Sequence, residues 1–187
     1  MTGRAHARAP ECVRTARLLL RRAGPEDVAL IFARYASDPA VCHRLAWRRH
    51  GSLADTTEFL AFSDEQWRRW PAGPYLVFDA AGNRLLGSTG LAFESLTRAS
   101  TGYVFARDAW GRGHATEALA AMIAVARDLG VNDLYAHCHT DHVASRRVLE
   151  KCGFRLEARL HEHVEFPNDQ PGVKQDALLY SMNPLAG

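Results

Sequence analysis

The sequence contains little lysine, few cysteines and no long apolar run. The four cysteines, Cys12, Cys42, Cys138 and Cys152, include no Cys-x-x-Cys pair. Their spacing therefore predicts neither a disulfide framework nor a zinc site, and a reducing compartment is the simplest expectation. No apolar stretch approaches the ~18 residues that a membrane-spanning helix needs, and the N-terminus lacks the apolar segment of a secretory signal. We therefore expect a cytoplasmic protein that does not associate with a membrane.

The net charge of +2 also argues against a nucleic-acid partner, because the chain has no basic stripe with interleaved aromatic residues. Only Lys151 and Lys174 are lysines among the 23 basic residues. Arginine suits bidentate contacts with phosphates and carboxylates. The same bias can follow from genome composition, so composition alone does not identify an anionic ligand.

The length of 187 residues and the apolar share of 47% are those of one ordinary domain with a core of its own. Residues 1–12 mix Arg, His, Ala and Pro without periodicity, which predicts a disordered leader. Residues 13–187 then form a single domain without internal repeats. Strands are predicted at residues 17–21, 75–78, 85–93, 101–105, 133–139, 154–164 and 174–182. Helices are predicted at residues 25–36, 39–45, from 52 through Trp67, from after Gly113 to residue 129, and at 142–152.

The segment from Tyr103 to Leu119 organises this pattern. A β-rich run breaks at Arg107-Asp108, passes Gly111 and Gly113, and enters a helix with apolar residues at i, i+3, i+4 and i+7 spacing. Small residues in such a turn let a ligand approach the main chain, and the helix N-terminus favours a phosphate or diphosphate. The same turn without a ligand is the alternative. The helix leads into the strand at 133–139, so the connection is a crossover and the two strands are parallel.

The run Trp-Gly-x-Gly-x-Ala-Thr-Glu-Ala at residues 110–118 resembles the Arg/Gln-x-x-Gly-x-Gly/Ala signature of the GNAT superfamily of acyl-CoA N-acyltransferases. Downstream, Ser-Arg-Arg-Val-Leu-Glu-Lys-Cys-Gly-Phe at residues 145–154 is similar to the Asn-x-x-Ser...Glu-Lys-x-Gly-Phe block of the branch that contains the ribosomal-protein N-terminal acetyltransferases. The resemblance implies an α/β (α+β) fold. Its mixed, centrally splayed sheet would have six to seven strands and helices on both faces.

The resemblance also implies that acetyl-CoA is the co-substrate. Its diphosphate would lie on the main chain of a turn made by Gly111, Arg112, Gly113, His114, Ala115 and Thr116, and its pantetheine arm beside Val104 and Phe105. Trp110 replaces the Arg or Gln that begins the family signature, which removes a polar side chain but no main-chain amide. His142 stands where the family usually has Asn. An imidazole can still donate to a cofactor oxygen, although it is bulkier and can titrate.

The catalytic roles are less well defined by the sequence. Ser145 matches the family serine that is proposed to assist the departing sulfur; the alternative is a buried serine bonded to its own helix. The tyrosine that serves this role in other branches would fall at Leu149. Glu94 and Glu162 are the first candidates for the general base, and His163 and Asp176 are the second. For each of them, an ordinary surface charge is the alternative.

Trp47, Arg48 and His50 resemble the Trp-x-x-His pattern of the same branch and predict one wall of the acceptor pocket. A tryptophan that packs a helix hairpin onto the sheet is the alternative. His137 and His139 share one strand face and His161-Glu162-His163 repeats the pattern, but nothing fixes a tetrahedral set. We therefore predict no metal site.

The sequence thus predicts an acetyl-CoA-dependent N-acetyltransferase in which a primary amine attacks the thioester directly. The acceptor is either the N-terminal α-amine of a protein or a small-molecule amine. A non-catalytic acyl-CoA-binding or regulatory module is the alternative, motivated by His142 and by Ser100, which precedes the central strand where the family often has an acid. The closing strand pair and an exposed sheet edge allow a homodimer.

Overall fold

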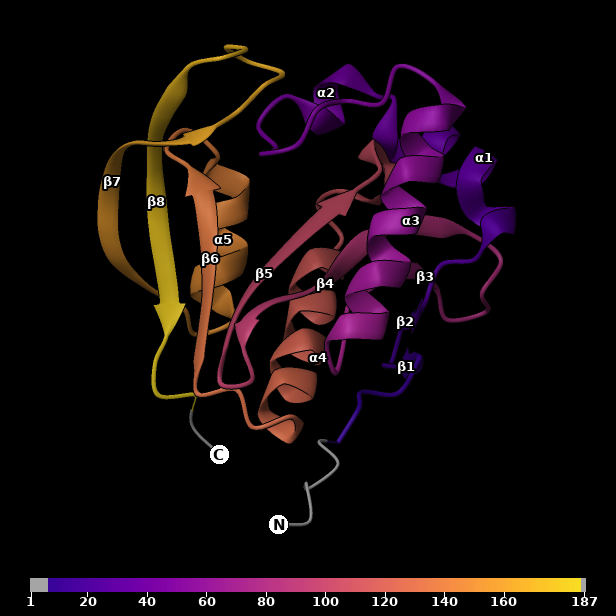
Figure 1. Ribbon diagram of the computed structural model, residues 1–187, viewed down its shortest axis with the longest axis horizontal. Helices are drawn as coiled ribbons and strands as arrows, with labels where there is room; N and C mark the ends of the chain where they lie inside the picture. The colour runs from indigo at the N-terminus through magenta and orange to yellow at the C-terminus, as the bar shows by residue number, and fades with distance from the viewer. Residues whose placement is uncertain (1–6, 186–187) are drawn as a thin grey trace.

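The computed structural model describes residues 7–185 and shows one mixed sheet between two layers of helices (Figure 1). The strands are β1 (Cys12–Arg14), β2 (Leu18–Arg21), β3 (Pro74–Asp79), β4 (Leu85–Ser95), β5 (Arg98–Phe105), β6 (Asp133–His139), β7 (Arg155–Glu165) and β8 (Lys174–Met182). Their spatial order is β1-β2-β3-β4-β5-β6-β8-β7. The sheet therefore has eight strands rather than six to seven, because the chain before β2 adds an edge strand.

The helices are α1 (Val28–Ile31), α2 (Pro39–Cys42), α3 (Leu53–Arg69), α4 (His114–Asp128) and α5 (Val143–Lys151). The short elements η1 (Pro25–Asp27) and η2 (Phe32–Ala36) adjoin α1 on either side, and η3 (Arg107–Ala109) lies between β5 and α4. The helix predicted at 25–36 thus consists of η1, α1 and the π-helical η2. The capping box at Ser52 is confirmed, since the Asp55 carboxylate accepts from the Ser52 amide at 3.0 Å.

Two buried clusters hold the helical layers on the sheet. Alternate residues of β3 belong to different clusters, with Tyr75 and Val77 in the one that includes Leu119 and Met122 of α4. Leu76 and Phe78 belong to the one that includes Ile31 and Leu60 of the α1–α3 side. This period-two alternation places α4 and α1/α3 on opposite faces. The expected helices on both faces are confirmed (Figure 1).

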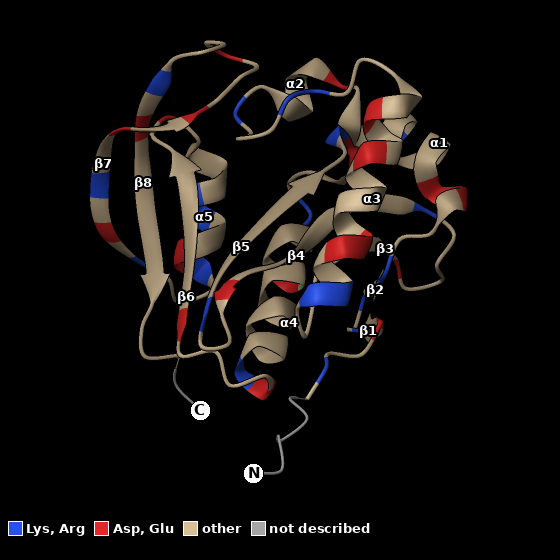
Figure 2. Cartoon of the chain, in the orientation of Figure 1, with Lys and Arg blue, Asp and Glu red and all other residues tan. Residues whose placement is uncertain are grey.

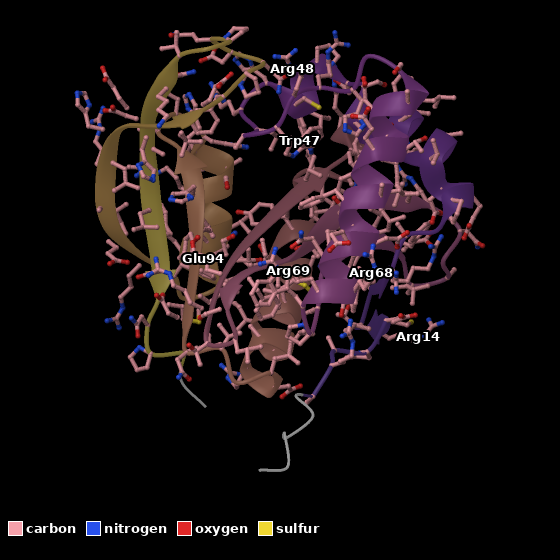
Figure 3. All side chains as sticks on the ribbon, viewed as in Figure 1. Arg14, Trp47, Arg48, Arg68, Arg69 and Glu94 are labelled. Atoms are coloured by element: carbon pink, nitrogen blue, oxygen red, sulfur yellow. The ribbon has the colours of Figure 1, made fainter. Side chains whose placement is uncertain are left out.

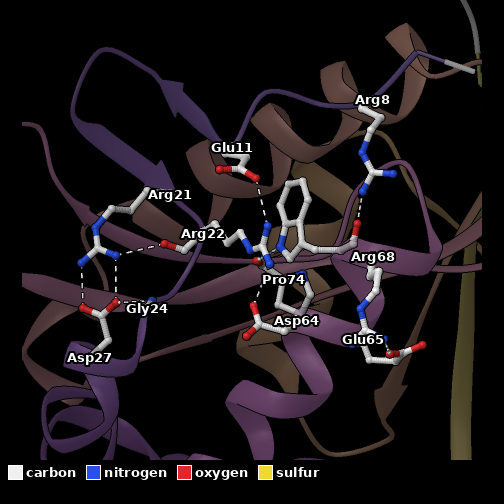
Figure 4. Close-up of polar contacts among 11 residues, drawn as sticks. Arg8, Glu11, Arg21, Arg22, Gly24, Asp27, Asp64, Glu65, Arg68 and Pro74 are labelled. Atoms are coloured by element: carbon white, nitrogen blue, oxygen red, sulfur yellow. Dashed lines mark hydrogen bonds and ion pairs between the residues drawn. The ribbon is translucent and has the colours of Figure 1, made fainter.

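Residues 7–12 lie within the expected leader, but the structure packs them against the domain. Ala9 is buried and its amide donates to the Pro71 carbonyl at 2.8 Å. Arg8 donates to the main chain of Trp67, as Figure 4 shows. Arg8 and Ala9 are thus held by residues about 60 positions away in the sequence. The first six residues of the expected leader lie outside the described residues.

All neighbouring strands pair antiparallel except β5 and β6. These two strands are parallel, as their crossover connection through α4 requires. They pair only from Arg98 to Ser100 on β5 and from Asp133 to Tyr135 on β6. Beyond these pairs the two strands diverge (Figure 1), so the sheet is splayed at its centre. Within residues 7–185, no helix is both long and apolar enough to cross a membrane.

Candidate active site

The gap between the diverging strands β5 and β6 contains a cavity of about 380 Å³. Both strands line it, together with β4, the first turn of α5, the loop after α2, Phe59 of α3 and Phe166. Beyond Ser100, the edge of β5 that faces β6 has no ladder partner. Apart from the Phe105 carbonyl, which accepts from the Trp110 indole, its main-chain groups are therefore free to bond a ligand that enters the gap.

The glycine turn, residues 111–116, lies where β5 leads into α4. Gly111 and Gly113 have φ angles of +70° and +76°, which favour glycine. A Cβ on Gly111 would meet nothing within 4 Å, and one on Gly113 would meet only the tip of Arg17 at 3.4 Å. No side chain caps the first amides of α4. The turn is therefore open to solvent and offers uncapped N–H groups to an anion.

Contacts from the rest of the fold fix the glycine turn in place. Arg17 donates to the Arg112 carbonyl at 2.9 Å and pairs with Glu117 of α4 at 2.6 Å. Just before the turn, Asp108 accepts from Arg34 at 2.8 Å, and its two arginine partners, Arg34 and Arg84, lower the pKa of its carboxyl to about 2. The conformation of the turn is thus set before any ligand binds.

Trp110 precedes this turn and is half-exposed. Its indole N–H donates to the Phe105 carbonyl at 2.7 Å. The tryptophan therefore occupies a main-chain acceptor at the end of β5, while Val104, one residue earlier, lines the cavity. The substitution at this family position leaves the amides of the glycine turn untouched.

Ser145 lies in the first turn of α5 and lines the cavity. The hydroxyl of Tyr103, from β5, lies 3.0 Å from Ser145 Oγ and 3.0 Å from the Ser145 carbonyl. Burial raises the pKa of Tyr103, so its phenol stays protonated at neutral pH. The pair joins β5 to α5 across the gap. A tyrosine hydroxyl thus accompanies the serine, although it comes from a strand rather than from the α5 position of Leu149.

Three histidines line the cavity. His139 accepts from the Asp141 amide at 3.0 Å and lies 3.3 Å from the Gln175 side chain, so both ring nitrogens have partners. His142 Nδ1 accepts a hydrogen bond from the Ser145 amide at 3.4 Å. Neither ring nitrogen of His137 forms a hydrogen bond with any described residue. His137 is exposed at the cavity surface, and its partial withdrawal from water, together with the nearby His163, lowers the pKa of His137, which keeps its imidazole neutral near pH 7.

The two carboxylates expected as bases do not line the cavity. Glu94 accepts from the Tyr135 hydroxyl and pairs with Arg98 at 2.9 Å, near the end where β5 and β6 are paired. Figure 3 shows Glu94 well away from Trp47. Glu162 is exposed in a bulge of β7, with a φ angle of +44°. The structure therefore brings Ser145 and His142 to the cavity but leaves both carboxylates outside its lining.

Trp47 lines the cavity from the loop after α2. His50 lies behind it, with ring centroids 5.4 Å from Trp47 and 6.3 Å from Phe59, and its Nδ1 lies 2.8 Å from the Thr56 hydroxyl. His50 therefore supports the wall rather than forming it. Arg48 is exposed and outside the lining, and Figure 3 shows it above Trp47.

The loop between β7 and β8 closes one end of the cavity. Asn168 donates to the carbonyls of Cys42 and Trp47, both at 2.8 Å, and accepts from the Arg49 amide at 2.7 Å. Phe166 of the same loop is buried, with its ring 4.6 Å from that of His139. These contacts tie the two halves of the splayed sheet together above the gap. Among residues 7–185, no three His, Cys, Asp or Glu side chains are placed to hold a metal ion.

Comparisons with known proteins agree with this architecture. The family model described as an acetyltransferase (GNAT) domain matches residues 17–155. The uncharacterized N-acetyltransferase YoaA of Bacillus subtilis (strain 168) is 26% identical over 178 residues, which cover 90% of this chain and 94% of the relative. The chain therefore belongs to the GNAT family of acetyltransferases, and it is an N-acetyltransferase.

Solved structures share the fold at lower identity. The ribosomal L7/L12 α-N-protein acetyltransferase RimL in complex with coenzyme A superimposes with a TM-score of 0.81 and 22% identity, over 95% of this chain and 100% of that one. The spermidine N-acetyltransferase from Vibrio cholerae in complex with CoA and spermine superimposes with a TM-score of 0.75 and 19% identity, over 91% of this chain and 97% of that one. The two enzymes have different acceptors, so the fold alone does not assign one here.

Sequence reasoning missed three groups that line the cavity: Arg44, Tyr103 as a polar partner of Ser145, and His137 as a free imidazole. His137 did carry a signal, since its alternation with His139 placed both on one strand face. Arg44 and the Tyr103 hydroxyl carried none, because each enters the gap from an element whose position depends on the tertiary fold.

Proposed function

We propose that the protein transfers an acetyl group from acetyl-CoA to a primary amine, which attacks the thioester directly without an acyl-enzyme. The observation that carries this proposal is a pair of features on consecutive parts of the chain: the cavity that β5 and β6 line, and the uncapped N-terminus of α4, which follows β5 through the glycine turn. The cavity suits a narrow arm that ends in a thioester. The uncapped helix N-terminus suits a diphosphate.

The binding roles follow the geometry of the turn. The main chain of Gly111 to Thr116 would bond the diphosphate. The exposed Arg112 side chain, which forms no hydrogen bond or ion pair with the described residues, would meet phosphate charge. The open edge of β5 around Val104 would bond the pantetheine amides. Acetyl-CoA supplies the activated acyl group, and the protein orients it.

Tyr103 and Ser145 would supply the proton that the departing thiolate needs. Ser145 Oγ–H would pass its proton to sulfur and take one from the Tyr103 hydroxyl, 3.0 Å away. The phenolate would then regain a proton from water. This arrangement gives the weakly acidic serine a protonated partner that the sequence alone did not provide.

His137 would accept the proton that the amine loses. Its imidazole lines the cavity, is neutral near pH 7 because its pKa is lowered, and has both nitrogens free of hydrogen bonds with described residues. Glu94, the first base predicted from sequence, would act on His137 through its charge rather than touch the amine. Trp47 and Phe59 would form the apolar wall of the acceptor pocket.

Calorimetric titration of acetyl-CoA and of free CoA tests the proposal, with Gly113→Glu as the disruptive variant. A glutamate there would place a negative charge at the diphosphate site and weaken binding by about a hundredfold or more. Gly130→Glu is the matched control, because Gly130 has a φ angle of +78° at the opposite end of α4 and the same backbone strain.

Loss of binding in Gly113→Glu alone supports the diphosphate site. Equal loss in both variants, or no heat with either ligand on the native protein, contradicts it. A protein that binds acetyl-CoA but acetylates no amine would instead be the non-catalytic module.

A further inference from the structure

Arg44 is the one described side chain in the cavity lining with a fixed charge, and the imidazoles beside it are also basic groups. Arg44 and the three histidines, His137, His139 and His142, line the cavity, whereas no described Asp or Glu does. The remaining lining residues are apolar or carry neutral polar groups. Figure 2 shows basic positions on the loop after α2, where the sequence has Arg44, Arg48 and Arg49. The cavity therefore has a basic wall and no acidic counterpart.

Arg44 is half-buried, and its guanidinium forms no ion pair or hydrogen bond with any residue in the described range 7–185. Two other arginines of the domain have acidic partners: Arg34 pairs with Asp108 at 2.8 Å and Arg107 with Asp38 at 2.8 Å. A half-buried arginine without an acidic partner is costly unless a ligand supplies one. Arg44 is thus available to an anion.

Asp169 and Glu94 lie near residues of the cavity wall, but neither carboxylate is part of its lining. Asp169 lies 3.8 Å from His43 Nε2 and 3.9 Å from His139 Nε2, outside the cavity lining. Glu94 is occupied by Tyr135 and Arg98. Burial, and secondarily Arg44, lower the pKa of His142, so that ring is neutral and Arg44 carries the fixed charge of this wall. An acceptor with a second cationic group would meet that charge without compensation.

We propose that the acceptor is a small primary amine that also carries a carboxylate, as an amino acid does, and that Arg44 binds this carboxylate. The inference rests on the proposed acetyl transfer and narrows its acceptor class. An arginine fork pairs with a carboxylate through two charge-assisted hydrogen bonds. The same charge rejects polyamines, because like charges within a partly buried site are strongly unfavourable. The cavity of about 380 Å³ must also hold the thioester, which leaves room for an acceptor of amino-acid size.

Matched pairs of acceptors test the proposal. ω-Amino acids from glycine to 6-aminohexanoate are compared with diamines of equal chain length, and release of free CoA from acetyl-CoA is measured. We expect kcat/KM to favour the amino acid in each pair and to peak at one chain length. That length reports the separation between the thioester and Arg44.

Substitutions of Arg44 test whether this side chain determines the preference for amino acids over diamines. Arg44→Gln should raise KM for the preferred amino acid by about tenfold to a hundredfold while the Kd for acetyl-CoA stays unchanged. Arg44→Lys should recover part of the loss, because a single ammonium replaces a bidentate fork. Arg49→Gln is the control; Arg49 is exposed in the same loop, outside the lining, and its removal changes the net charge equally.

The outcomes separate this inference from the proposed function. Faster turnover of the diamines, or equal effects of Arg44→Gln and Arg49→Gln, would overturn the acceptor class while acetyl transfer stands. Failure to acetylate any carboxylate-bearing amine, with acetyl-CoA bound, would overturn it as well. A change in acetyl-CoA affinity in Arg44→Gln would reassign Arg44 to the cofactor. Only the absence of acetyl-CoA binding to the native protein removes the proposed function itself.

Discussion

The Tyr103 hydroxyl lies 3.0 Å from Ser145 Oγ, across the gap between the two strands that open at the centre of the sheet. Tyr103 comes from β5 and Ser145 from the first turn of α5, which are 42 residues apart in sequence. The contact places two hydroxyl groups in series at the cavity wall. It is the only hydrogen-bonded hydroxyl pair that joins β5 to α5 within the described residues.

Tyr103→Phe should lower kcat by about a hundredfold, because it removes the proton source behind Ser145. The ring still fills its place, so the Kd for acetyl-CoA should not change. Ser145→Ala should have a similar effect, and the double variant should be little worse than either single one, since both residues act in one relay. Single-turnover rates and calorimetry measure the two quantities. Strictly additive losses would contradict a relay.

His137→Gln should also lower kcat/KM by about a hundredfold near pH 7 and remove the acidic limb of the pH profile. The neighbours of His137 move that limb in opposite directions. His163 lowers the pKa of His137, so His163→Gln should raise it and shift the limb to higher pH. Glu94 raises the pKa of His137, so Glu94→Gln should shift the limb to lower pH. Profiles of kcat/KM between about pH 5 and 8 measure both shifts. An unchanged limb in both variants would remove His137 from the base role.

Much of the fold could be predicted from local pattern. The segment at 133–139 and the segment at 174–182, which follows a loop rich in Pro, Gly, Asn and Asp, were predicted with the bounds of β6 and β8 as observed. The Ser52-Asp55 box marked the start of α3. β1 could not be predicted in this way. Its three residues lack alternation, and the strand exists because β2 pairs with it and because the preceding chain packs on Trp67 and Pro71.

The candidate site likewise has one part that local sequence predicts and another part that depends on the tertiary structure. The glycine turn is a local structure, so residues 111–116 were identifiable from spacing. The cavity is a tertiary structure, formed because β5 and β6 separate after Ser100, and the sequence cannot report which side chains then face the gap. Glu94 illustrates the difference. It ends a strand beside the site, as predicted, but Tyr135 and Arg98 bind its carboxylate outside the lining.

Stability should depend on a buried ion pair near the start of the domain. The Asp27 carboxylate is almost fully buried and accepts from Arg21 at 2.7 and 2.8 Å and from the Gly24 amide at 2.8 Å (Figure 4). Asp27→Ala should therefore lower the free energy of unfolding by about 3 kcal/mol, because Arg21 is left without its partner. Denaturant unfolding measures the change.

Asp64→Ala is the matched control for that pair. Asp64 pairs with Arg22 at 2.8 Å but is more than half exposed. Its loss should cost less than about 1 kcal/mol, since solvent screens the charges. Equal costs for the two aspartates would show that burial of Asp27 does not determine its contribution.

Asn168 should control the acceptor side of the cavity. Its side chain bonds the main chain at Cys42, Trp47 and Arg49, and so holds the loop that carries both Trp47 and Arg44. Asn168→Ala should release this loop, raise KM for the amine about tenfold and lower stability by about 2 kcal/mol, because three hydrogen bonds are lost. Acetyl-CoA affinity should stay the same, since the glycine turn is held separately by Arg17 and Asp108.

Gln170→Ala, an exposed change in the same β7–β8 loop, is the control and should leave the amine KM, the stability and the acetyl-CoA affinity unaltered. If Asn168→Ala instead weakens acetyl-CoA binding and spares the amine KM, the loop after α2 belongs to the cofactor side of the cavity.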